Sequence, residues 1–128
     1  MAELNQRWAK YTSQGVQLVG INSNDPVQYP DDSYAAMQAR VQQIGHNFPY
    51  LVDETQATAH AYGAVCTPDF FVYDQSRQLV YRGRFDDNWK NSDAVTVQDL
   101  PDAVEAVLGD ASVNNDQKAS MGCSIKWK

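Results

Sequence analysis

The chain has 128 residues, which is the usual length of one domain. Hydrophobic residues make up 43% of it and charged residues 20%, a balance that is typical of a soluble globular protein and excludes a disordered one. The formal net charge of −6 would repel nucleic-acid phosphates and anionic membrane surfaces, so neither is expected as a partner.

The chain begins with a predicted helix and a predicted strand. Leu4, Trp8 and Tyr11 recur at helical spacing, which predicts an amphipathic helix over residues 2–13. The apolar run at 15–22 is too short for a helix and rich in β-branched residues. Such a run predicts a strand that is covered on both faces.

A polar loop and a second helix follow. Residues 22–32 are rich in Asn, Asp and Pro, which interrupt regular structure. Asp32 or Ser33 can cap a helix over residues 34–44. Gly45 can end this helix, because glycine readily takes the left-handed conformation that closes a helix.

The middle of the chain predicts another strand and a short helix. Residues 48–53, "FPYLVD", favour a short strand. Asp53 or Thr55 can cap a brief Ala-rich helix that ends at Gly63.

Two further strands and a last helix complete the pattern. Residues 69–74 and 78–85 are strand-like and joined by the short turn "DQSR", which predicts an antiparallel hairpin. A helix over residues 100–108 carries an apolar stripe. We expect Asp99 to cap this helix, with Pro101 in its first turn, where the missing N–H costs little.

The end of the chain has a different texture. Residues 110–122 are polar and show no periodicity, so we expect an exposed strap, closed by the apolar and basic segment "CSIKWK". This change predicts a domain over residues 1–109, followed by a C-terminal segment over residues 110–128.

The cysteines and histidines do not indicate a metal site or a cofactor. Cys66 and Cys123 are far apart and form no C-x-x-C motif, so two reduced thiols are expected. His46 and His60 have no carboxylate at ligand spacing, and we assign neither a role.

The sequence also favours a cytoplasmic location. The longest uncharged apolar run, "FFVY", is far shorter than the roughly 20 residues of a membrane helix. The opening "MAELNQRWAK" lacks the apolar centre of a signal peptide.

Several stretches together resemble one family. The order of elements is the α/β layout of a thioredoxin-like domain, in which helices sandwich a mixed sheet. The stretches "GVQLVGINSND", "FPYLVDETQATAHAYGAVCTPDFFVYD", "LVYRGRFDD" and "GCSIKW" resemble a peroxiredoxin-like branch of the alkyl hydroperoxide reductase and thiol-specific antioxidant (AhpC/TSA) family. This resemblance places Pro68 in the family's cis-proline loop at the active site, with Thr67 supplying backbone groups there.

The sequence departs from the family in one respect. The resemblance implies a β-strand and a cysteine-bearing turn before the segment that corresponds to residues 2–13. A thiol at a helix N-terminus is activated by the helix dipole and free N–H groups. We therefore expect an N-terminally truncated member that lacks the first core strand, which would lie between the strands at 15–22 and 69–74, and lacks the principal redox cysteine.

Both cysteines have two interpretations. Cys66 is either a small buried hydrophobe or a secondary or resolving thiol beside Pro68. Arg82 and Arg84 are the charges on the next strand that could lower its pKa. Cys123 is either an anchoring side chain or a partner thiol for Cys66, and a disulfide would require the two Cα atoms to lie within about 7 Å.

Two functions follow from the resemblance. The first is a thiol-dependent oxidoreductase with antioxidant activity in cell redox homeostasis. It would reduce a peroxide or exchange disulfides near Pro68 and take electrons from a dithiol reductant such as thioredoxin. The alternative is a redox-silent thioredoxin-like binding module or fragment, completed by a strand from another copy in a homo-oligomer.

Overall fold

The computed structural model describes residues 2–45, 48–88 and 90–128. The chain forms two compact units, Met1–Ala64 with Ile125–Lys128, and Val65–Ser124. In each unit, helices accompany short strands, as expected of an α/β protein. Compact units are not necessarily domains, and the boundary after residue 109 therefore stays a prediction.

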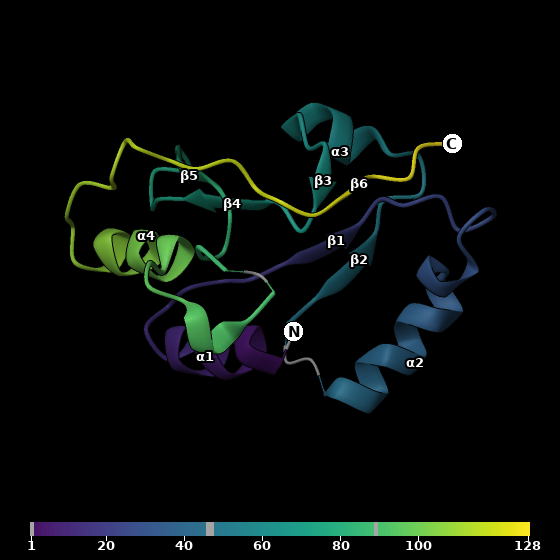
Figure 1. Ribbon diagram of the computed structural model, residues 1–128, viewed down its shortest axis with the longest axis horizontal. Helices are drawn as coiled ribbons and strands as arrows, with labels where there is room; N and C mark the ends of the chain where they lie inside the picture. Colours follow the sequence, from purple (N-terminus) through teal and green to yellow (C-terminus); the bar gives the residue numbers. More distant parts are fainter. Residues whose placement is uncertain (1, 46–47, 89) are drawn as a thin grey trace. The chain divides into compact units, whose positions relative to one another are not determined.

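The first unit pairs two parallel strands, β1 and β2 (Figure 1). Ile21 of β1 lies opposite Leu51 of β2. The order of elements is the predicted one: α1 (Ala2–Thr12), β1 (Gly20–Asn22), the 3-10 helix η1 (Pro30–Asp32), α2 (Tyr34–Ile44), β2 (Tyr50–Val52) and α3 (Ala57–Tyr62).

The helices of this unit follow the sequence signals closely. Trp8 and Tyr11 of α1 are buried, as the amphipathic pattern predicted. The Ser33 hydroxyl accepts a hydrogen bond from the N–H of Ala36 at 3.2 Å, which confirms Ser33 as the cap of α2. Gly45 follows α2 with φ +75°, the left-handed conformation expected there.

The expectation for the first strand was wrong in two respects. β1 covers only Gly20–Asn22, and Val19 and Ile21 are 49% and 44% exposed rather than covered on both faces. Among the described residues, β1 pairs only with β2, and the pairing covers the three residues of each strand. No other strand of the described residues pairs with the outer edge of β1, where alternate N–H and C=O groups point away from β2.

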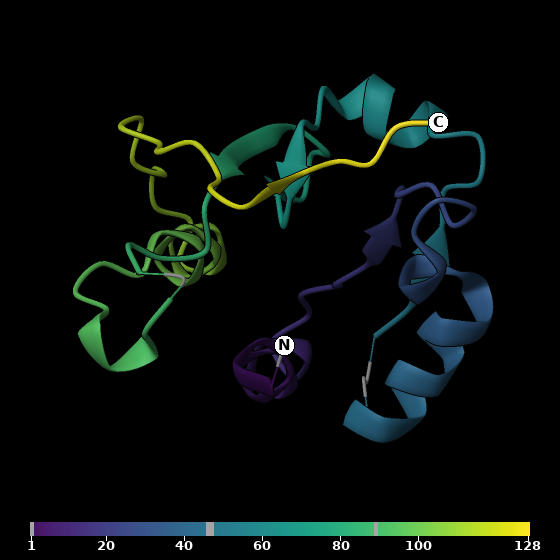
Figure 2. The ribbon, with the colours of Figure 1, turned by 45° about the vertical axis from the view of Figure 1, so that its right-hand side comes forward.

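The second unit contains two antiparallel ladders and a helix (Figure 2). β4 and β5 form the predicted hairpin, and β3 pairs with β6. The core consists of Tyr81, Leu100 and Ala103, with Phe70 and Phe85 among the residues packed against it. The elements are β3 (Cys66–Thr67), β4 (Phe70–Tyr73), β5 (Leu79–Gly83), η2 (Ser92–Ala94), α4 (Asp99–Leu108) and β6 (Cys123–Ser124).

The predicted cap of α4 was wrong. Asp99 is the first residue of the helix, and Gln98 precedes it without a side-chain cap. The Asp99 carboxylate instead lies 2.8 Å from Nε of Arg84, so it is engaged in an ion pair from outside the helix. A negative charge in the first turn still favours the helix, because the N-terminal end of the helix dipole is positive.

The strap is exposed, as predicted, but it is attached to the sheet. The Gln117 side chain accepts from the N–H of Arg82 at 3.1 Å and donates to the carbonyl of Val80 at 2.8 Å. The carbonyl of Lys118 accepts from the N–H of Arg84 at 3.1 Å. The strap therefore covers the outer edge of β5, which the sequence did not indicate.

The last four residues form an extended tail in the first unit. The carbonyl of Lys126 accepts from the N–H of Asp25 at 2.8 Å and from the Gln56 side chain at 3.0 Å. Trp127 stacks on His60 with ring centroids 4.3 Å apart. Ile125 is only 5% exposed, so the segment "CSIKWK" ends in a docked tail.

Candidate functional site

The loop after β3 has the geometry that the resemblance implied. Cys66 and Thr67 form β3, and the peptide bond between Thr67 and Pro68 is cis. Cys66 is half-buried, whereas Thr67 and Pro68 are exposed. The part that Thr67 and Pro68 play in an active site stays a prediction.

The β3–β6 ladder places the two cysteines on paired strands, but their side chains lie on opposite faces of the ladder. Cys66 lies opposite Ser124, and Thr67 lies opposite Cys123. Opposed residues in a ladder share a face and successive residues alternate, so the two thiols lie on opposite faces. Both are free, and joining them would require a change of register or a backbone movement. The partner role of Cys123 stays a prediction.

The thiol of Cys66 belongs to a small polar network. Its Sγ donates to the carbonyl of Ser120 at 3.5 Å. The Ser120 hydroxyl donates to Oδ1 of Asp69 at 2.7 Å, and Oδ2 of Asp69 lies 3.4 Å from the Arg82 guanidinium. The Asp69 side chain is only 5% exposed, so its charge acts on Cys66 with little screening by water.

This environment disfavours the thiolate. Burial raises the pKa of Cys66, the charge of Asp69 raises it further, and Arg82 lowers it by less, so the net shift is upward. Of the two arginines that the sequence offered, Arg82 is the one whose charge acts on the thiol, and Arg84 is paired with Asp99. In this conformation Cys66 is therefore protonated at neutral pH.

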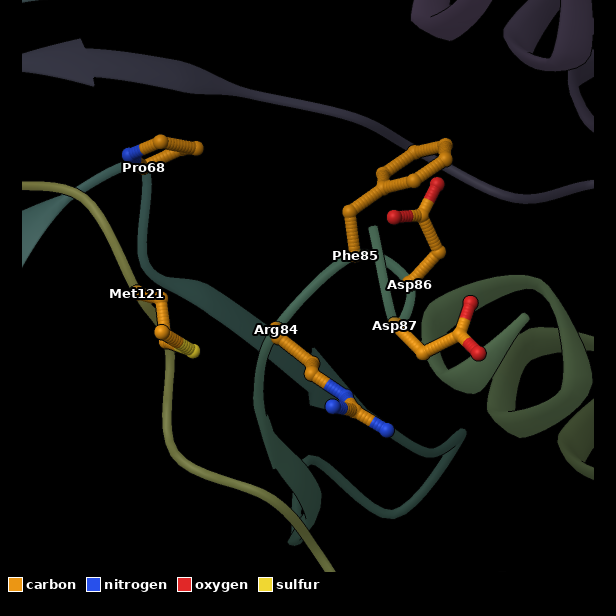
Figure 3. Close-up of a pocket in the computed structure, with 6 residues that line it drawn as sticks. All are labelled: Pro68, Arg84, Phe85, Asp86, Asp87 and Met121. Carbon is orange, nitrogen blue, oxygen red and sulfur yellow. The ribbon is translucent and has the colours of Figure 1, made fainter. Parts of the chain in front are cut away.

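A small hollow lies beside the cis-proline. Its volume is about 40 Å³, enough for a few water-sized molecules. Figure 3 shows Pro68 and Met121 at one side of it and Arg84 with its neighbours at the other. The lining residues are Pro68, Arg84, Phe85, Asp86, Asp87 and Met121. Cys66 does not line it, so the hollow is not a substrate pocket for this thiol in the present conformation.

Two residues of the site were missed by sequence reasoning. Asp69 follows Pro68 directly, and an acid so close to the Cys66 thiol was a signal that could have been used. Ser120 had no such signal, because only the pairing of β3 with β6 brings it to Cys66.

The histidines and the other potential metal ligands that the structure describes do not form a second candidate site. His60 stacks on Trp127, and His46 lies outside the described residues. In the described ranges, no group of three or more His, Cys, Asp or Glu side chains is placed to hold a metal ion. Nor does any helix in those ranges have the length and apolar character needed to cross a membrane.

Comparison with known proteins gives a family and two close structural matches. The model of the AhpC/TSA family matches residues 1–82. The crystal structure of a hypothetical protein from Sinorhizobium meliloti 1021 matches with 46% identity and a TM-score of 0.93, over 99% of this chain and 70% of that one. An uncharacterized conserved protein from Geobacillus kaustophilus matches with the same identity and TM-score, over 99% of this chain and 68% of that one. No curated protein matches the sequence.

Proposed function

The chain belongs to the AhpC/TSA family of thioredoxin-like, peroxiredoxin-type oxidoreductases, and on this premise we propose that it carries out thiol-based redox chemistry at Cys66. The observation that carries the proposal is the half-buried thiol of Cys66 two residues before the cis-proline Pro68. Cys66 and Cys123 are the only cysteines of the sequence. The chemistry of this chain must therefore begin from one of these two thiols or from a thiol on a partner.

The raised pKa of Cys66 favours a resolving role over direct attack on a peroxide. Direct attack on a peroxide at neutral pH is fastest for a thiol with a depressed pKa, because the thiolate is the nucleophile. A resolving thiol attacks the sulfur of a sulfenic acid or disulfide, which is already activated. Once deprotonated, a thiol of high pKa is a stronger nucleophile than a thiol of low pKa. Cys66 is therefore a secondary or resolving thiol, with a peroxide or a disulfide as the ultimate oxidant.

The proposed step is an attack of the Cys66 thiolate on an oxidised sulfur. The Cys66 thiol loses its proton, and the thiolate sulfur attacks the sulfur of a sulfenic acid or disulfide on a partner. A new S–S bond forms while the S–O or S–S bond breaks, and the leaving hydroxide or thiolate takes up a proton. A dithiol reductant such as thioredoxin then reduces the new disulfide by two exchanges and restores the thiol. Cys123 is the candidate internal partner if the β3–β6 ladder shifts.

A second candidate function is a redox-silent binding module. Its support is the hydrogen bond from Cys66 to Ser120, which is typical of a packed thiol, together with the outer edge of β1, with which no other described strand pairs. An added strand, for example from another copy of the chain, would pair with that edge. In this function Cys66 and Cys123 only pack.

Oxidised glutathione and hydrogen peroxide distinguish the two functions. We expect the full chain and its Cys123→Ser variant to form a mixed disulfide at Cys66 with oxidised glutathione at pH 8, which reduced thioredoxin removes. Mass spectrometry of tryptic peptides reads the modification, and Cys66→Ala is the control. Direct consumption of hydrogen peroxide should be slow in all forms.

Cys66 that is modified by neither oxidant up to pH 9, in a chain that remains folded, contradicts the oxidoreductase function and favours the binding module.

A further inference from the structure

One stretch of the C-terminal segment closes over the thiol of Cys66. Residues 117–124, which we call the gate segment, run along β5 and then pair with β3. We propose that the gate segment is a lid that opens and closes over Cys66 and so determines when this thiol can react. The inference rests on the proposed function of Cys66 and adds its regulation.

Ser120 makes two contacts that hold the closed state at Cys66. Its carbonyl accepts from Sγ of Cys66 at 3.5 Å, and its hydroxyl donates to the Asp69 carboxylate at 2.7 Å. One residue of the gate segment thus contacts the thiol and also the acid beside it. Movement of the segment would remove both contacts together.

Gly122 allows the close approach of the segment to the loop. A Cβ atom at Gly122 would lie 2.2 Å from the carbonyl oxygen of Thr67, far inside a van der Waals contact. Any larger residue therefore has to push the segment away from β3. The glycine is a requirement of the closed state rather than of a turn.

The polar contacts to β5 hold the other end of the gate segment. Gln117 bonds to the backbone of Arg82 and Val80, and Lys118 bonds to the N–H of Arg84. These are hydrogen bonds at an exposed sheet edge, each of which contributes little to stability.

The gate segment is held more weakly than the chain before it. No residue from 117 to 124 is buried. In contrast, Val113 packs against the core of the second unit. Segments with few buried apolar contacts and exposed hydrogen bonds are the ones that open locally. The gate segment can therefore open while the chain before it stays in place.

Opening of the gate segment would make the thiol of Cys66 more reactive. Burial is the largest cause of the raised pKa of this thiol. An open gate segment exposes the thiol to water, which lowers its pKa and makes it accessible. The closed segment accordingly protects a reduced thiol until a partner displaces it.

Alkylation by iodoacetamide tests the gate without any redox step. The parent is the full chain with Cys123→Ser, so that Cys66 is the one thiol. We expect Gly122→Val in this parent to be alkylated about tenfold faster at pH 8, because the clash with the Thr67 carbonyl destabilises the closed state locally. Ala119→Val, which places the same valine side chain at another exposed position in the segment, should stay within about twofold of the parent.

A second variant keeps the test decisive if Gly122→Val does not fold. Gln117→Ala removes the side-chain bonds to β5 and the bond to the carbonyl of Asn114 within the strap, and we expect about threefold faster alkylation with circular dichroism unchanged. Hydrogen exchange of residues 119–124 should accelerate in both variants.

Faster hydrogen exchange without faster alkylation of Cys66 overturns the gate. So does a parent whose Cys66 is alkylated as fast in the folded chain as in the chain unfolded by urea. Mixed-disulfide formation is a separate readout. A gate that passes the alkylation test in a chain that forms no mixed disulfide leaves the gate standing and contradicts the proposed function.

Discussion

At the scale of the residue, the charge of Asp69 and the charge of Arg82 oppose each other at Cys66. Burial and Asp69 raise the pKa of the thiol, and Arg82 lowers it. Asp69→Asn should therefore shift the pH midpoint of Cys66 alkylation downward, and Arg82→Gln should shift it upward. The pH dependence of the iodoacetamide rate in the Cys123→Ser chain measures both shifts. Arg77→Gln, on the exposed hairpin turn, is the matched control.

Equal midpoints in all these variants would show that the charges do not reach the thiol. Only two residues separate Asp69 from Cys66 in the sequence, a signal that the sequence analysis did not use. The sequence could not give the sign of the net shift, since burial is a property of the folded chain.

At the scale of the element, Asp53, one of the two cap candidates that the sequence offered for α3, accepts hydrogen bonds from the N–H groups of Thr58 and Ala59 in the first turn, while Gln56 holds the N-cap position. Burial raises its pKa, but hydrogen bonds from the N–H of Ala59, the hydroxyl of Ser23 and the N–H of Thr58 outweigh burial and lower the pKa. Asp53→Ala should reduce the free energy of unfolding by about 1 kcal/mol at pH 7. A lowered pKa stabilises the fold when the pH is above the pKa of the carboxyl group in the unfolded chain. This contribution is lost as the pH falls through the pKa of the same group in the folded chain.

The difference between the wild-type chain and Asp53→Ala should therefore shrink below about pH 4. Urea unfolding at pH 7 and at pH 3 measures it, with Glu54→Ala on the exposed neighbour as control. A difference that stays constant with pH would contradict the carboxylate of Asp53 as the acceptor for the first turn of α3.

The elements were predictable where the signals were local. A capping Ser33, a terminal Gly45 and the hairpin turn after β4 each act over a few residues, and each is confirmed. The cap of α4 failed because Asp99 has a distant partner in Arg84, which sequence reasoning did not anticipate.

At the scale of the whole molecule, the outer edge of β1 predicts self-association if the binding-module function holds. Ile21 lies on β1 and is 44% exposed, and among the described residues β1 pairs with no strand other than β2. Ile21→Lys should then lower the fraction of dimer in sedimentation experiments, because a lysine on an edge strand opposes strand addition. Val27→Lys, at a loop residue that is 83% exposed, should leave it unchanged. A chain that remains monomeric at high concentration contradicts strand completion.

The sequence by itself determined the family, the α/β order of elements and the cis-proline loop. The order of elements follows from periodicity and turn residues, which act within short stretches of chain. The family and the cis-proline loop follow from the resemblance of several stretches to the AhpC/TSA family. The tertiary structure alone decided what surrounds Cys66. Ser120 and Gly122 reach the Cys66–Pro68 loop only because β6 pairs with β3, and the two thiols lie on opposite faces because of the register of that pair. Register, burial and close approach arise from contacts between residues that are distant in sequence, so no local pattern encodes them.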